Sequence, residues 1–144
     1  MAATIEQVGL VNIKDFKENI VGYELELLCT AHTDNSLVVT LNDTIMKRMG
    51  GSFVLGLNSI PGATKPTTDS DLEIADSDGV SLLGTNGTDF IDDTDSRATM
   101  LYNSKLSINI QPLVVADNNW VVTLSNNAVA SAVFTLKIVC MINR

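Results

Sequence analysis

The chain has 144 residues and a formal net charge of −8 at pH 7, with 45% hydrophobic and 18% charged residues. This composition is too apolar for a disordered protein, and nine basic residues among seventeen acidic ones do not form the basic face of a nucleic-acid binder. No apolar run approaches the roughly 20 residues that span a bilayer, and the N-terminus lacks the pattern of a secretory signal, so we expect assembly in a cytoplasm without membrane contact.

Residues 1–20 are predicted to form an extended N-terminal arm. The segment 12–20 also has apolar residues at helical spacing, and a short helix there is an alternative. The arm carries apolar side chains that can dock on a neighbouring molecule or fold over the chain's own core. They are Ile5, Val8, Leu10, Val11, Ile13 and Phe16.

Alternation with a period of two predicts several strands after the arm. In "VGYELELLCTAH" (21–32) one face is apolar and the other carries Glu24 and Glu26. Strands are also expected over 36–42 and over 51–60, the second ending at Pro61-Gly62. Between them, 42–51 offers Asn42 or Asp43 as an N-cap and glycines as a stop, which favours a second short helix.

The acidic stretch 67–90 suggests either a calcium loop or the turn of a hairpin. No register places oxygen ligands, a central Gly and a final Glu as an EF-hand requires. "DSDG" (76–79) is typical of a turn, so we interpret 71–84 as a hairpin. The next run, 89–97, is interpreted as a solvated acidic loop, with acid–base chemistry by Asp92, Asp93 or Asp95 as the alternative.

The C-terminal third predicts further strands over 106–116, where Pro112 marks an edge or break, and on either side of "NNAVA" (126–130). Both faces of 131–142 are largely apolar, which indicates a central or doubly covered strand. Trp120 is interpreted as a core or interface anchor, with stacking on a sugar as the alternative. Cys29 and Cys140 are predicted to be buried apolar side chains, rather than a disulfide or metal ligands.

These patterns predict an all-β fold, an antiparallel β-sandwich or jelly-roll over residues 21–144, with at most two short helices besides the arm. His32 is the only histidine, and no phosphate loop, dinucleotide fingerprint or nucleophile elbow is present, so no catalytic, cofactor or metal site is assigned. The partner interface is predicted from apolar side chains of the arm and the lone tryptophan: Ile5, Val8, Leu10, Ile13, Phe16 and Trp120.

Residues 51–142 resemble a group of small virion proteins of tailed bacteriophages. The resemblance rests on "SFVLGLNSI", on "PGATKPTTDSDLEIADSDGVSLLG" with its Pro-Gly turn and D-x-D-G-V strand, and on the late "NNWVVTLSNN" and "SAVFTLKIVCMI". It implies a β-sandwich cement or decoration protein without catalytic residues. Such a protein sits on the outer capsid surface and bridges major capsid subunits as a trimer or dimer. A tail or head–tail connector subunit is the main alternative, and a carbohydrate-binding sandwich a further one.

Overall fold

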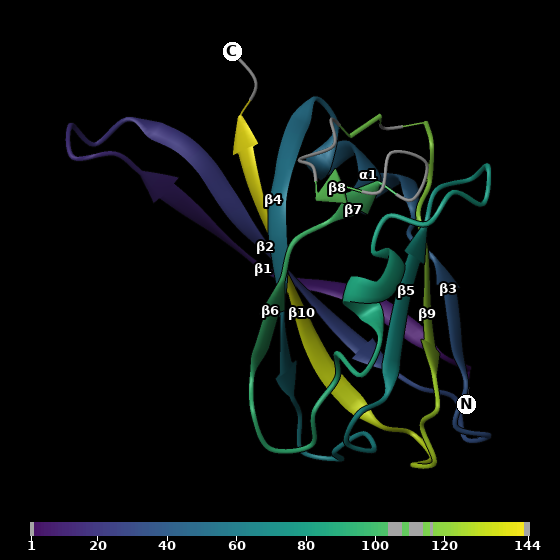
Figure 1. Cartoon of the computed structure of the whole chain (residues 1–144). Coiled ribbons are helices and arrows are strands. Elements are labelled where there is room, and N and C mark those ends of the chain that lie inside the picture. The colour runs from purple at the N-terminus through teal and green to yellow at the C-terminus, as the bar shows by residue number, and fades with distance from the viewer. Residues whose placement is uncertain (1, 104–107, 110–113, 116, 143–144) are drawn as a thin grey trace.

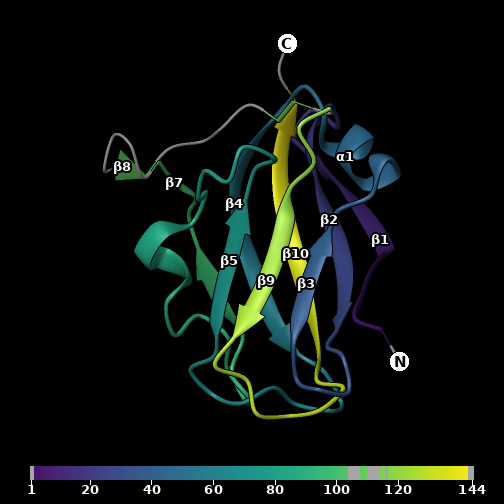
Figure 2. The same ribbon diagram turned by 90° about the vertical axis from the view of Figure 1, so that its right-hand side faces the viewer.

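The computed structural model describes residues 2–103, 108–109, 114–115 and 117–142, and two antiparallel β-sheets dominate it (Figure 1). The larger sheet has the strand order β1-β2-β10-β4-β6 and the smaller one β3-β9-β5. Figure 2 shows the smaller sheet lying in front of the larger one. With 49% of the residues in strands, this is the all-β sandwich predicted from the sequence.

The bounds of the elements place every long strand in the larger sheet. That sheet consists of β1 (Thr4–Lys14), β2 (Ile20–Thr30), β10 (Val133–Ile142), β4 (Ser52–Pro61) and β6 (Arg97–Thr99). The smaller sheet consists of β3 (Leu37–Thr40), β9 (Val121–Ser125) and β5 (Asp71–Ala75). A two-stranded ribbon of β7 (Tyr102–Asn103) and β8 (Ile108–Asn109), the helix α1 (Asp43–Met49) and the 3-10 turn η1 (Gly84–Gly87) complete the described elements.

Alternating side chains from both sheets form one hydrophobic core. In β2 the residues Leu25, Leu27 and Cys29 are fully buried, and their outward neighbours Glu24 and Glu26 are partly exposed. The same alternation runs along β10, which lies in the middle of the larger sheet between β2 and β4. The central position predicted for 131–142 is therefore confirmed, because β10 pairs with β2 along one edge and with β4 along the other.

Helix α1 forms where the sequence predicted it, and the helix considered over 12–20 does not form. The Asn42 side chain caps α1 by accepting the N–H of Ile45 at 2.9 Å. In contrast, β1 continues to Lys14 and a turn then leads into β2. That turn is closed by the Asp15 carboxylate, which accepts the backbone N–H groups of Lys17 and Asn19 at 2.8 and 3.0 Å.

The acidic stretch 67–90 contains the predicted hairpin. Asp76 Oδ1 accepts the N–H groups of Asp78 and Val80 at 3.0 and 2.9 Å, and Gly79 has a φ of +80°. The chain then returns along β5, with the N–H of Leu82 donating to the Ile74 carbonyl at 2.8 Å. Turn chemistry thus accounts for Asp76 and Gly79. Of the strands predicted over 106–116, β8 is described, and Pro112 lies outside the described residues.

Candidate interaction surface

The N-terminal segment predicted to be an arm is a strand of the sheet, and its far part projects from the sandwich as a hairpin with β2. Figure 1 shows the end of β1, the start of β2 and the turn between them projecting from the body of the sandwich, away from the smaller sheet. Six large apolar side chains in this part are exposed, and Phe16 at the turn is 92% exposed. We call them the hairpin surface: Val8, Leu10, Val11, Ile13, Phe16 and Ile20.

The register of the hairpin places apolar groups on both of its faces. Leu10 pairs with Leu25, so the two share the face that turns toward the core. Val11 pairs with Glu24 and Ile13 with Gly22, on the opposite face. A register shift between Gln7 and Gly9 leaves Val8 unpaired as a bulge. Because the hairpin extends beyond the sandwich, neither face is covered by the smaller sheet.

The outward face of the hairpin continues across the larger sheet as a row of apolar residues. Gly22 pairs with Met141 on β10, and Met141 pairs with Phe53 on β4. Met141 is 43% exposed and Phe53 is partly buried. Ile13, Gly22, Met141 and Phe53 therefore form a cross-strand row that enlarges the hairpin surface at its base.

The charges within the hairpin sum to zero, and those on the adjoining part of the sheet are partly neutralised. The segment 8–20 contains two lysines, one aspartate and one glutamate, so its formal charge is zero in a chain with a net charge of −8. On the next part of the sheet, Lys137 Nζ lies 3.5 Å from Glu24 and 3.4 Å from Glu26. The two carboxylates, Glu24 first, raise the pKa of Lys137 and keep it charged. The surface is thus apolar and close to neutral.

The free edge of β1 belongs to the same surface. β1 is the outermost strand of the larger sheet, so every second residue directs its backbone N–H and C=O away from β2. Natural edge strands are usually protected by charges, prolines or bulges. The run Val8–Ile13 has neither charge nor proline, and the irregularities in its pairing with β2 lie at its two ends, at Val8 and between Ile13 and Lys14. Residues 10–14 thus present an open edge.

Four of the six residues predicted for a partner interface lie on the hairpin surface, and two do not. Val8, Leu10, Ile13 and Phe16 are exposed there. Ile5 and Trp120 are 7% and 4% exposed and belong to the core, which is the alternative that the sequence left open for each of them. Ile5 pairs with buried Cys29 and turns inward with it, before the bulge.

Val11 was named among the apolar side chains of the arm that can dock on a neighbour, whereas Ile20 and Met141 were not predicted as contact residues at all. Period-two alternation extends through Val11 and Met141, but it does not reveal that their strands extend beyond the smaller sheet. The burial of Trp120 also removes the aromatic platform on which the sugar-binding alternative depended, because a stacking platform must be open to its ligand.

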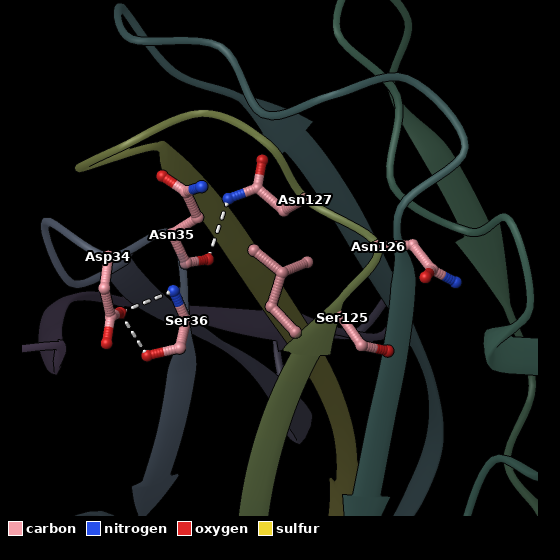
Figure 3. A pocket seen from close by; sticks show the side chains of 7 residues that line it. Asp34, Asn35, Ser36, Ser125, Asn126 and Asn127 are labelled. Atoms are coloured by element: carbon pink, nitrogen blue, oxygen red, sulfur yellow. Dashed lines mark hydrogen bonds between the residues drawn. The ribbon is translucent and has the colours of Figure 1, made fainter.

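A polar hollow of about 240 Å³ lies at one end of the smaller sheet, between the loop 32–36 and the loop after β9 (Figure 3). Its polar groups bond one another. The Asp34 carboxylate accepts the N–H and hydroxyl of Ser36 at 3.0 and 2.5 Å, and Asn127 donates to the Asn35 carbonyl at 3.0 Å. The two hydrogen bonds from Ser36 are the main cause that lowers the pKa of Asp34. The hollow is explained by the turns that form it.

The acidic residues of the run 89–97 are largely solvated, as predicted from the sequence, except for Asp92. Asp92 is buried, and its carboxylate bonds the Arg97 guanidinium, which also lies 3.3 Å from Asp69. The N–H of Thr94, at 2.9 Å, is the main cause that holds the pKa of Asp92 well below its usual range, with Arg97 adding to it. An ionised carboxylate cannot donate a proton, so Asp92 does not suit a general acid and instead fastens the loop to β6.

The two cysteines are buried as predicted and form no disulfide. Burial raises the pKa of both thiols, which makes them poor nucleophiles and metal ligands. Within the described ranges, no group of three or more His, Cys, Asp or Glu side chains is placed to hold a metal ion. In the same residues, no helix combines the length and the apolar character needed to cross a membrane.

Comparison with known proteins gives no independent assignment. No family model matches the chain, and neither a curated protein nor a solved structure is similar to it.

Proposed function

We propose that this chain is a non-enzymatic structural protein of a virion, which binds the outer capsid surface and stabilises contacts between major capsid subunits. The observation that carries this proposal is the hairpin surface, which supports a role for the chain as a part of a larger protein assembly. Six large apolar side chains stand exposed on one projecting element, and Phe16 is almost fully exposed. An apolar patch of this kind is typical of a protein–protein contact.

The virion setting is supported by the resemblance of residues 51–142 to decoration proteins of tailed bacteriophages. A small rigid sandwich suits that role, because its core holds the projecting element in a fixed direction. Many copies that bind only the assembled shell stabilise it by mass action. The acidic remainder of the chain, with a net charge of −8, suits a basic surface on the capsid and keeps the particle soluble.

The first test is the copy number of the protein in purified particles of the phage whose genome encodes it, measured by quantitative mass spectrometry. Decoration predicts one copy per major capsid protein, or a simple fraction that amounts to hundreds per particle. A handful of copies would assign the chain to the tail or the head–tail connector. Absence from the particle would overturn the virion proposal.

The second test asks whether the bound protein stabilises the shell. Particles that lack the protein are heated with and without added purified chain, and DNA release is followed by dye fluorescence. We expect added protein to raise the release temperature in proportion to its occupancy. Stoichiometric binding without any change in release temperature would contradict a stabilising role.

A further inference from the structure

We infer that the hairpin surface is where two copies of this chain join, by antiparallel pairing of the free β1 edges. The inference rests on the proposed function in one respect, that the exposed hairpin is a protein contact, and it names a second copy of the chain as the partner. The pairing extends the five-stranded sheet across a two-fold axis into a ten-stranded one.

The electrostatics of the chain favour a second copy at this place. Two molecules with a net charge of −8 repel each other over most of their surfaces. The segment 8–20 is formally neutral, and the nearby Glu24 and Glu26 are paired with Lys137. The segment 8–20 thus adds no net charge to a contact with a like-charged copy.

The order of residues along β1 makes the strand complementary to itself. A two-fold axis at Asn12 places Val11 of one copy opposite Ile13 of the other, on the same face of the sheet. The same register pairs Leu10 with Lys14, whose alkyl stem can cover it. Within the paired segment 10–14 no two like charges face each other.

The same arrangement involves the two most exposed apolar residues of the hairpin. Phe16 lies in the turn just beyond Lys14 and Val8 at the bulge just before the paired segment, so both flank the seam and lie near the second copy. Phe16 is 92% exposed and Val8 55% exposed in the isolated chain. Pairing would thus cover an aromatic ring at the turn and the side chain at the bulge.

A dimer of this kind also suits a protein that bridges capsid subunits. Each copy keeps its own sandwich surface free for the shell, and the two sandwiches point away from the common axis. Two linked binding modules dissociate more slowly than one, because the second contact is made at a high effective concentration.

The test is sedimentation equilibrium of the purified full chain over a range of concentrations, with two matched variants. Val11→Lys places a charge in the proposed seam. Val38→Lys places the same charge on β3, an edge strand of the other sheet, at a valine that is 66% exposed. We expect a dimer for the wild type and for Val38→Lys, and a monomer for Val11→Lys. A wild-type monomer at all concentrations, or a dimer that Val11→Lys leaves intact, would overturn the inference.

A cross-link tests the register without destabilising the contact. Opposed residues of antiparallel strands have Cα atoms about 4.5–5.5 Å apart, within the range of a disulfide. Asn12→Cys should therefore form a disulfide-linked dimer under mild oxidation, whereas Val38→Cys should not. Cys29 and Cys140 are buried and should not interfere. In addition, Phe16→Ala should weaken dimerisation about tenfold or more. Equal cross-linking of the two cysteine variants would refute the β1 seam.

The outcomes separate this inference from the proposed function. A dimer that is missing from the particle would leave the seam standing and remove the virion role. An abundant capsid component that sediments as a monomer would keep the virion role and remove the seam.

Discussion

Gly22 is the position where a single methyl group should most disturb the base of the hairpin. It lies on β2 between Ile13 on β1 and Met141 on β10. A Cβ atom at this position would lie 2.3 Å from the carbonyl oxygen of Cys140. That oxygen belongs to the backbone of a paired strand, so it cannot rotate away as a side chain would. Gly22→Ala must therefore push β2 and β10 apart.

The expected cost follows from this contact. Overpacking of well-packed sites lowers the free energy of unfolding by typically 1–3 kcal/mol, and we expect about 2 kcal/mol because two backbones must separate. For a chain of this length, about 2 kcal/mol corresponds to a fall in Tm of roughly 6–8 °C. The variants are compared by thermal unfolding followed by circular dichroism. Both are made in the Val11→Lys background, so that association does not contribute to Tm.

Gly9→Ala is the matched control in the same hairpin. Its Cβ would meet Glu26 Oε2 at 2.9 Å, and this atom is the end of a flexible side chain. We expect Gly9→Ala to stay within about 0.5 kcal/mol of its parent, since alanine also lowers the entropy of the unfolded chain. If both alanine variants unfold within about 1 °C of the parent, the close approach of β2 and β10 at Gly22 is refuted.

Three further predictions concern the rest of the fold. The folded-state pKa of Asp92 is below its unfolded value near 3.9, so its stabilising contribution is present above about pH 4 and is lost as the pH falls further. Below about pH 4 the Tm of the wild type should therefore drop more steeply than the Tm of Asp92→Asn. Parallel curves of Tm against pH would contradict the buried carboxylate. Cys29 and Cys140 should resist a thiol reagent in the native protein and react fully in denaturant, whereas fast native labelling would show that one of them is accessible. Asn42→Ala should lower the free energy of unfolding by about 1 kcal/mol in urea titrations while Asn42→Asp retains it, because the side-chain oxygen at this position caps α1.

Local patterns in the sequence predicted the elements that local chemistry determines. Alternation identified β2 and β10, since each buries one row of side chains in the shared core. The cap residue Asn42 and the glycines at 50 and 51 bounded α1. The helix considered over 12–20 was wrong, because the spacing of Ile13, Phe16 and Ile20 fits a strand followed by a turn as well as it fits a helix. The Asp15 turn and the pairing of β1 with β2 decided between these two conformations.

Contacts between distant residues explain what the sequence did not reveal. Asp92 occurs in a run of acidic residues whose composition predicts a solvated loop. It is nevertheless buried, because Arg97 supplies an ion pair and the backbone N–H of Thr94 a hydrogen bond to its carboxylate. Trp120 stands beside two asparagines, and its ring nevertheless lies in the core. Neither outcome has a local signature, since each depends on how β6 and β9 pack against the remainder of the chain.

The same kind of sequence has opposite consequences in β10 and in β1. Both strands carry apolar residues on both faces, a pattern that indicates a covered strand. β10 has a neighbour on each side, and its alternate residues are fully buried. β1 has a neighbour on one side only, and its far half extends past the smaller sheet with the apolar residues exposed. The apolar faces of this half of β1 have no cover within the described chain, and this is the reason why we propose that a second molecule covers them.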